Sequence, residues 1–351
     1  MTLETLEIAP GYAISRVIRG GWQLAGGHGA IDRMQAVEDL VAAFDAGVTT
    51  FDCADIYTGV EELYGALRER LRSDRGEDAA RRLRVHTKLV PDLATLPTIR
   101  RADIEAIVDR SLRRLRVDRI DLVQFHWWDY AQGRWLEAMN WLDDLRRAGK
   151  LELVGGTNFD TDHVGEVLAA GIPLASMQVQ YSVLDRRPEN GFVELCRAHG
   201  VALLCYGTVA GGFLSDRWLG AAEPTAPIAN RSLVKYKLII EDFGDWALFQ
   251  ELLGALRRVA DRHGADIASV ASRFTLDYPG VAAVIVGATS RAHLAANVAA
   301  AGLALTDEDR AEVEAVAGRR RGPNGDVYAL ERDRNGRHGS IMKYNLNAER
   351  A

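Results

Sequence analysis

Residues 83–126 read LRVHTKLVPDLATLPTIRRADIEAIVDRSLRRLRVDRIDLVQFH, and this stretch decides the fold class. It opens with a short apolar run (83–89) and closes with another (120–126). Between them, at 101–116, apolar residues recur every three or four positions. That spacing predicts an amphipathic helix, and the short apolar runs predict buried strands. The stretch is therefore typical of a strand–helix–strand unit with parallel strands.

The same alternation continues in both directions from this unit. We expect eight strands, at residues 16–24, 48–52, 83–89, 120–126, 151–156, 174–179, 201–206 and 281–287. We expect helices at residues 32–46, 60–72, 101–116, 134–148, 160–170, 189–199 and 245–263. Eight such units predict an α/β fold, a closed (β/α)8 TIM barrel, rather than an open doubly wound sheet. No GxGxxG segment follows the first strand, so the fingerprint of a Rossmann dinucleotide fold is absent.

The first predicted helix (32–46) shows how the pattern assigns a buried face. Asp32 precedes it as a candidate N-cap, and Gly47 follows it as a stop signal. Its larger apolar residues fall at helical spacing, so we expect them to face the core. They are Met34, Val37, Leu40, Val41 and Phe44.

Two segments depart from the alternating pattern. Residues 207–243 form a long connection after the seventh strand, which we expect to carry short helices and to cover the rim of the barrel. Residues 318–351 lack helical periodicity but contain apolar groups near their end. We therefore expect a single barrel domain at 1–317 and a C-terminal extension at 318–351 that packs on it and completes the pocket.

Composition excludes several classes of function. The chain has 351 residues, 48% of them apolar and 26% charged, and a net charge of −6, without a basic excess that would favour nucleic acid. No apolar run approaches the ~20 residues of a membrane helix. The start of the chain does not read as a signal peptide, and three unpaired cysteines favour a reducing compartment, so we expect a cytoplasmic protein without a metal site. The sequence indicates no oligomeric state.

Four reactive side chains stand where apolar runs end. Asp52, Lys88 and His126 close strand-like runs, and Tyr57 follows in the turn DIYTG. In a barrel of parallel strands the carboxyl ends share one rim, so these side chains should meet. Taken singly, Asp52 would be interpreted as a turn former and Lys88 as a solvated charge. Tyr57 would be interpreted as a packing residue and His126 as a core histidine. Their shared position at strand ends favours a catalytic site instead.

Each of the four side chains has a chemical role in this hypothesis. Tyr57 is the general acid, because a nearby ammonium from Lys88 would lower the pKa of its phenol. Asp52 would hold Lys88 charged through a charge-assisted hydrogen bond. His126 would orient the substrate oxygen or share in proton delivery.

Seven segments in order resemble the motifs of the aldo-keto reductase superfamily. FDCADIY, VHTKL and DLVQFHWWD resemble its Asp, Tyr, Lys and His motifs. GGTNF, MQVQYSVLDR, CYGTVAGGFLS and VIVGATSRAHLAANV resemble the later cofactor motifs, which are most similar to the bacterial and plant branches related to potassium-channel β subunits. The resemblance runs from about residue 14 to 317. It implies hydride transfer between a nicotinamide cofactor and an aldehyde or ketone, with the cofactor extended across the barrel mouth.

The resemblance also assigns cofactor-binding residues. Asn158 and Gln178 would bind the carboxamide, and Tyr206 would stack on the nicotinamide. Backbone groups of the glycine-rich segment after Tyr206 would follow the pyrophosphate. The full set implied is Gly21, Trp22, Asn158, Gln178, Tyr206, Gly207, Val209, Gly211, Gly287, Thr289, Ser290, His293 and Asn297.

The last cofactor motif departs from the family pattern. His293 stands where many members have Arg or Gln, and Ala296 replaces an acid before Asn297. Arg291 is a candidate to replace the missing cation near the adenosine 2′-phosphate. The expected cofactor is NADP(H), with NAD(H) as the alternative.

The substrate should be a small carbonyl compound bound over the nicotinamide. Trp22 and Trp127 are the expected substrate-binding residues, and aromatic walls favour apolar or sugar-faced substrates. One of the adjacent Trp127 and Trp128 is expected to be packed under a loop.

Three alternatives remain open. The same residues would serve a sugar or alcohol dehydrogenase that works in the oxidative direction. Lys88 would form a Schiff base in an aldolase. A non-catalytic regulatory subunit would use the same fold.

Overall fold

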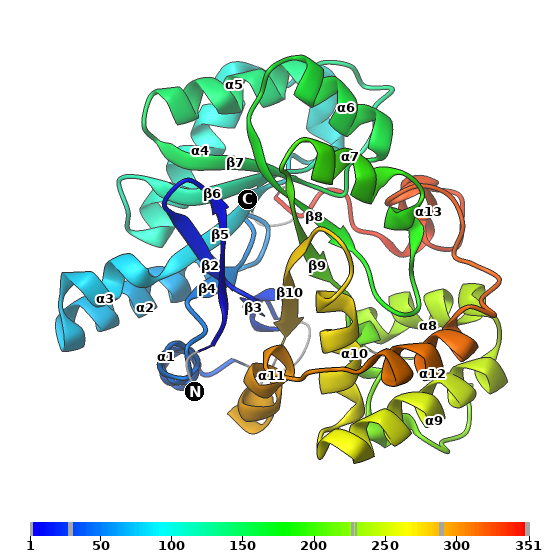
Figure 1. Ribbon diagram of the computed structural model, residues 1–351. Coiled ribbons are helices and arrows are strands. Elements are labelled where there is room, and N and C mark those ends of the chain that lie inside the picture. Colours follow the sequence, from blue (N-terminus) through cyan, green and yellow to red (C-terminus); the bar gives the residue numbers. More distant parts are fainter. Residues whose placement is uncertain (1–2, 27–30, 226–227, 229, 288–290, 348–351) are drawn as a thin grey trace.

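Eight parallel strands close into a barrel, which confirms the predicted (β/α)8 fold (Figure 1). The computed structural model describes residues 3–26, 31–225, 228, 230–287 and 291–347. Around the barrel the strand order is β10-β3-β4-β5-β6-β7-β8-β9. These strands are β3 (Val17–Gly20), β4 (Thr50–Asp52), β5 (Arg84–Leu89), β6 (Ile120–Phe125), β7 (Leu151–Thr157), β8 (Leu174–Gln180), β9 (Ala202–Tyr206) and β10 (Val281–Gly287).

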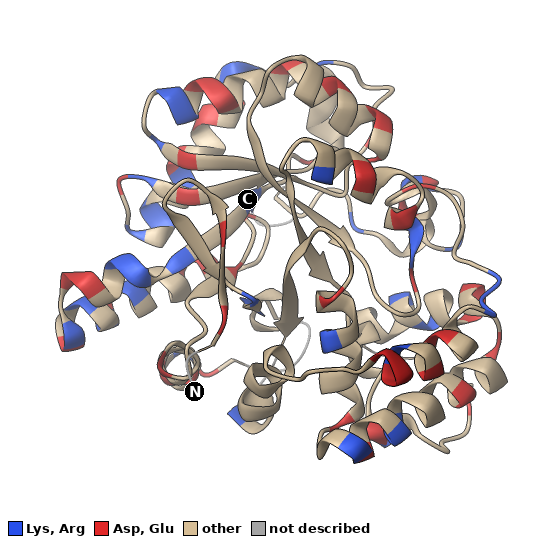
Figure 2. Ribbon diagram, in the orientation of Figure 1, with Lys and Arg blue, Asp and Glu red and all other residues tan. Residues whose placement is uncertain are grey.

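Helices surround the barrel, and the main core lies between them and the strands (Figure 1). The helices are α1 (Arg33–Asp45), α2 (Val60–Arg75), α3 (Glu77–Arg82), α4 (Arg101–Leu115), α5 (Trp135–Arg147), α6 (Thr161–Ala169), α7 (Phe192–Ala198), α8 (Arg231–Phe243), α9 (Trp246–His263), α10 (Ile267–Leu276), α11 (Leu294–Ala301), α12 (Asp307–Ala317) and α13 (Ala329–Arg332). Charged residues lie mainly on the outer helices, with both signs interspersed, whereas the barrel strands carry few (Figure 2). A charged side chain buried inside the barrel is therefore unusual in this molecule and is a candidate for a functional role.

An antiparallel hairpin that the sequence did not predict precedes the barrel. It consists of β1 (Thr5–Ala9) and β2 (Tyr12–Ser15). Tyr12 and Ile14 are fully buried and pack with inward-facing residues such as Leu122. Because β2 ends just before β3 begins, the hairpin closes the amino end of the barrel. Its first strand is largely exposed and lacks an apolar run, which explains why the pattern did not reveal it.

Two details of the first βα unit correct the predictions. The first strand ends at Gly20 rather than Leu24, because Trp22–Leu24 form a 3₁₀ turn. In α1, Asp32 caps the helix as predicted, accepting hydrogen bonds from two backbone amides. Met34, however, is 81% exposed. The buried stripe begins at Ala36, and residues two apart on a helix do not share a face.

The two irregular segments both reach the carboxyl end of the barrel. Residues 207–243 contain α8, which at 13 residues is longer than the short helices expected. The C-terminal segment, residues 318–347 of the described chain, is joined to α6 by Asp326, which accepts hydrogen bonds from Thr161 N (2.8 Å) and Oγ1 (2.9 Å). Farther on, the amide of Leu93 donates to the carbonyl of Tyr344 at 2.9 Å. In the described parts of the chain, no helix is long and apolar enough to cross a membrane.

Candidate active site

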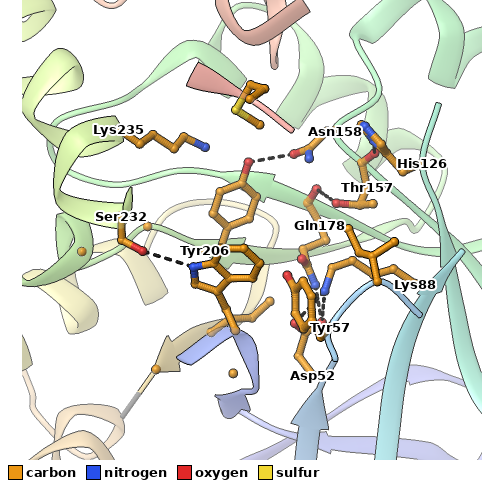
Figure 3. Close-up of a pocket in the computed structure, with 18 of the residues that line it drawn as sticks. Asp52, Tyr57, Lys88, His126, Thr157, Asn158, Gln178, Tyr206, Ser232 and Lys235 are labelled. Atoms are coloured by element: carbon orange, nitrogen blue, oxygen red, sulfur yellow. Dashed lines mark hydrogen bonds and ion pairs between the residues drawn. The ribbon is translucent and has the colours of Figure 1, made fainter. Parts of the chain in front are cut away.

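A buried ion pair between Asp52 and Lys88 lies at the carboxyl end of the barrel (Figure 3). The ammonium of Lys88 donates to both carboxylate oxygens of Asp52, at 2.9 and 2.7 Å, and to the carbonyl of Cys53 at 2.8 Å. The amides of Gln124 and Gln178 also donate to Asp52, at 3.1 and 2.6 Å. Burial alone would lower the pKa of Lys88, but the charges of Asp52 and Tyr57 and the hydrogen bonds to Asp52 together outweigh it, and the pKa is raised. Lys88 is therefore a permanent ammonium.

Tyr57 lies beside this ammonium, in the turn before α2. The Lys88 Nζ is 5.1 Å from the centre of the Tyr57 ring. Burial raises the pKa of the Tyr57 phenol, and although Lys88 opposes this through its charge and a hydrogen bond, the net direction is upward. The predicted net acidification is thus wrong, because desolvation of the phenolate exceeds the attraction of Lys88. The phenol stays protonated at neutral pH and retains a proton to donate.

His126 follows β6 and is neutral. Burial, with a further contribution from the charge of Arg332, lowers the pKa of His126 to about 3. Its Nδ1 lies 3.1 Å from the carbonyl of Thr157, so Nδ1 carries the proton and donates it in this hydrogen bond. The other ring nitrogen, Nε2, therefore holds a lone pair. In this state His126 Nε2 accepts a hydrogen bond from a hydroxyl group, but it has no proton to deliver or to donate to a carbonyl oxygen, which corrects the predicted role for a carbonyl substrate.

These side chains line one cavity of about 350 Å³, within the roughly 300–1,000 Å³ range of small-molecule sites. Four buried polar atoms in its lining residues have no hydrogen-bond partner among the described residues. They are Gln23 Oε1, His126 Nε2, Trp128 Nε1 and Thr208 Oγ1. These four atoms are available to hydrogen-bond a ligand in the cavity.

Most of the predicted cofactor residues surround the same cavity. The hydroxyl of Tyr206 donates to Asn158 Oδ1 at 2.8 Å (Figure 3). Gly207 and Gly211 have φ of +79° and +64°, and a Cβ at either would lie 2.7–2.8 Å from Tyr236. The missing side chains thus let Tyr236 of α8 pack directly against this backbone at the wall of the cavity. Further lining residues from the predicted set are Trp22, Gln178, Val209 and Gly287.

Two of the predicted binding positions, Gly21 and Trp127, need correction, and a third, Gln178, lines the cavity but also has a hydrogen-bond partner within the protein. Gly21 does not line the cavity, and Gly20 does. The Gly21 amide donates to the Asp52 carbonyl at 2.8 Å, and a Cβ there would lie 2.7 Å from Tyr64 and Val60, so this glycine is needed for packing. Trp127 is fully buried in the core, and Trp128 lines the cavity in its place. The amide nitrogen of Gln178 is already engaged by Asp52.

The adenosine end of the predicted site is described only in part. Thr289 and Ser290 lie outside the described residues. His293 is exposed, and neither His293 nor Asn297 lines the cavity. Arg291 donates to Asp39 at 2.6 Å, so the cation suggested for the 2′-phosphate is paired with a carboxylate of α1.

Sequence reasoning missed the residues that α8 and the C-terminal segment bring to the cavity. Lys235 lies 5.1 Å from the centre of the Tyr206 ring and 3.7 Å from Glu331. Glu331 is fully buried and is held by two hydrogen bonds from Arg187. Burial lowers the pKa of Lys235, although Glu331 opposes the shift. Both segments were expected at the rim of the barrel and do line the cavity, but nothing in their spacing indicates which of their residues do so. The lining residues from these segments are Ser232, Val234, Lys235, Tyr236, Tyr328, Ile341, Met342, Lys343 and Leu346.

Comparison with known proteins agrees with this arrangement. The sequence pattern of the aldo/keto reductase family matches residues 16–317. The chain therefore belongs to the aldo/keto reductase family, whose members are oxidoreductases that use nicotinamide cofactors. In the described residues there is no group of three or more His, Cys, Asp or Glu side chains that could hold a metal ion.

Three similar proteins illustrate the range of relatives. The NADH-specific methylglyoxal reductase of Escherichia coli is 26% identical over 84% of this chain and 92% of its own length. Flagellar radial spoke protein 5 of Chlamydomonas reinhardtii is also 26% identical, over 70% of this chain, but the match spans only 56% of that protein. The structure of the glycerol dehydrogenase of Gluconobacter oxydans has a TM-score of 0.75, with 26% identity over 92% of this chain and 97% of that one.

Proposed function

We propose that this protein reduces an aldehyde or ketone to an alcohol, with NAD(P)H as the reductant and Tyr57 as the general acid. The observation that carries the proposal is the joint position of Tyr57, the Asp52–Lys88 ion pair and His126 in one cavity. The unpartnered polar atoms and the glycines beside Tyr206 fit a cofactor. Tyr206, Asn158, Gly207 and Gly211 would hold it. The chemistry that the cofactor supplies when bound is hydride donation.

The chain's own residues would then supply the proton. The Tyr57 phenol is protonated at neutral pH, and the adjacent Lys88 ammonium stabilises the phenolate left after proton transfer. Asp52 fixes the Lys88 ammonium through two short hydrogen bonds. Apolar walls from Trp128, Met342 and Leu346 would exclude water and favour an apolar carbonyl substrate.

Replacing Tyr57 by Phe tests the proposal. We expect Tyr57→Phe to lower kcat for a panel of aldehydes by roughly 10²- to 10⁴-fold, the usual contribution of general acid catalysis, while cofactor Kd stays unchanged. NADPH absorbance measures turnover. Tyr278→Phe is the matched control, because it removes a buried hydroxyl without a partner among the described residues and outside the cavity. Retained turnover in Tyr57→Phe would exclude Tyr57 as the proton donor.

For cofactor choice we propose a preference for NADP(H) that is weakened by Asp39. The pairing of Arg291 with Asp39 reduces the positive charge available to a 2′-phosphate. We expect Asp39→Asn to release Arg291 and to lower the KM for NADPH relative to that for NADH. Steady-state kinetics with both cofactors measures this ratio. A clear preference of the natural chain for NADH, the cofactor named for the E. coli relative, would contradict the proposal.

A second candidate function is alcohol oxidation by the same residues. It is favoured by the lone pair on His126 Nε2, which accepts a hydrogen bond from a hydroxyl group but not from a carbonyl oxygen. The similarity to a glycerol dehydrogenase agrees with it. Matched alcohol and carbonyl pairs, assayed in both directions, decide between the two. No turnover in either direction would instead favour a non-catalytic subunit.

The structure gives less support to an aldolase. A Schiff base requires a neutral amine, whereas Lys88 donates to three oxygen acceptors and has a raised pKa. Borohydride trapping of substrate on Lys88 would revive this alternative.

A further inference from the structure

We infer that Arg332, in the C-terminal segment, is a positioning residue that fixes the two strand-end loops carrying His126 and Asn158. The inference rests on the proposed function and extends it to a part of the chain beyond the family match at 16–317. Arg332 is the last residue of α13 and reaches the barrel mouth from outside the βα repeat.

The guanidinium of Arg332 binds both loops at once. It donates to the carbonyls of Trp127 and Trp128 at 2.5 and 3.0 Å, directly after His126. It also donates to the carbonyl of Asn158 at 2.7 Å. These contacts join positions more than 170 residues apart in the sequence. A planar fork of N–H donors can bridge several acceptors in this way, and a lysine ammonium cannot match its geometry.

Tyr130 anchors the same guanidinium. The Tyr130 hydroxyl accepts a hydrogen bond from Arg332 at 2.7 Å, and the guanidinium carbon lies 4.0 Å from the centre of the Tyr130 ring. Among the described residues, no carboxylate lies within ion-pair distance of Arg332, in contrast to its neighbours Arg334 and Arg337. Its hydrogen bonds therefore go to three backbone carbonyls and the Tyr130 hydroxyl, and none belongs to an ion pair with a described carboxylate.

Both of the loops it holds need support at this point. Asn158 adopts a left-handed backbone, with φ of +62°, which is costly for a residue other than glycine. Its side chain accepts the hydrogen bond of the Tyr206 hydroxyl. On the other loop, Trp128 packs edge-on against the His126 ring, with centroids 4.3 Å apart. Releasing the three carbonyls would let the His126 and Asn158 side chains shift relative to Tyr57.

The test compares Arg332→Ala and Arg332→Lys with Arg334→Ala. Arg334 is exposed, and its one ion pair with a described residue is to Asp129 at 3.4 Å. We expect Arg332→Ala to lower kcat about 10- to 100-fold, since a misplacement near 1 Å can cost that much. Arg332→Lys should recover little, and Arg334→Ala should match the natural chain. Added alkylguanidinium, well below denaturing concentration, should restore part of the activity of Arg332→Ala only. Unchanged kcat, or a loss that parallels a fall in Tm and ignores alkylguanidinium, would overturn the inference.

Hydrogen–deuterium exchange gives a readout that does not depend on activity. In Arg332→Ala we expect faster amide exchange in residues 127–131 and 158–161, with the rest of the barrel unchanged. If the natural chain turns over no substrate in either direction, the proposed function fails, and this measurement still decides the role of Arg332. Unchanged exchange in both loops would refute the positioning role even in an active enzyme.

Discussion

At the scale of single residues, Asp55 is a second buried carboxyl, in the turn that carries Tyr57, and it differs sharply from Asp52. It is 1% exposed, and its closest cation, Arg110, lies 3.5 Å away. Burial, and next the charge of Glu61, raise the pKa of Asp55 to about 8, whereas Asp52 has an ammonium at 2.7 Å. Asp55 is therefore protonated in the folded protein at neutral pH.

We predict that Asp55→Asn stabilises the protein relative to the natural chain increasingly as the pH rises from about 4 to 8, with the full effect above pH 8. The unfolded carboxyl titrates near ~3.9, so the folded state holds one more proton between about pH 4 and 8. Stability is then lost as pH rises through this window, by at most about 1.4 kcal/mol per pH unit, and the loss ends above the folded pKa. Asparagine does not titrate and avoids this loss. Thermal unfolding at pH 5 and pH 9 measures the difference.

The control for Asp55→Asn is Asp78→Asn, which changes an exposed carboxyl on α3. We expect its Tm to follow that of the natural chain at both pH values. Equal pH dependence of Asp55→Asn and the natural chain would show that Asp55 is ionised in the folded state.

The sequence predicted which candidate catalytic residues meet better than it predicted their protonation states. Asp52, Lys88 and His126 meet because strand ends share a rim, which spacing reveals. The net pKa direction of Tyr57 depends on the balance of burial and charge, which spacing does not contain. Likewise, Trp127 and Trp128 follow the last residue of β6, where strand alternation stops predicting which side chain faces inward.

At the scale of elements, the segment after β9 shapes the cavity through its glycines. Gly207 has φ of +79°, and its missing side chain leaves room for the Tyr236 hydroxyl of α8. Gly220, in the same segment, has φ of +73°, but a Cβ added there would meet no heavy atom within 4 Å. Comparing substitutions at Gly207 and Gly220 therefore separates the cost of backbone strain from the cost of steric crowding.

We predict that Gly207→Ala costs more than Gly220→Ala. Both place alanine in the left-handed region, at about 1–2 kcal/mol. Only Gly207→Ala must also displace Tyr236, which adds about 1–3 kcal/mol of overpacking and narrows the proposed cofactor groove. Urea unfolding and cofactor Kd measure the two effects. If both variants lose the same stability and the same cofactor affinity, α8 moves aside at no cost to make room for the alanine side chain.

Strands and helices could be predicted where apolar residues recur with a regular period. They could not be predicted where tertiary contacts determine which residues are buried. All eight barrel strands and helices α1, α2, α4, α5, α6, α7 and α9 could be predicted from periodicity, whereas α10, α11 and α12 were not predicted. The β1–β2 hairpin could not, because its buried residues Tyr12 and Ile14 become core only against the closed barrel. Similarly, the 13 residues of α8 form a helix that packs over the cavity rather than between strand and solvent.

At the scale of the whole molecule, the C-terminal segment is both part of the core and part of the pocket wall. Val327 and Tyr328 belong to the main hydrophobic core. Met342 and Leu346 are half-buried and line the cavity. Sequence could predict that the segment docks, but its contacts span large separations, such as the 255 residues between Asn347 and Asp92. No local pattern encodes contacts of that range.

We predict that the two roles of the C-terminal segment can be separated. Met342→Ala with Leu346→Ala should widen the cavity and shift kcat/KM from small towards bulkier apolar carbonyl substrates, with a Tm close to that of the natural chain. Truncation after Arg321 should instead lower Tm by many degrees, because it removes Val327 and Tyr328 from the core and leaves Arg187 without Glu331. If the ratio of kcat/KM between bulky and small substrates is unchanged in the double variant, Met342 and Leu346 do not contact the substrate. If the truncated chain has the same Tm as the natural chain, the barrel is stable without the C-terminal segment.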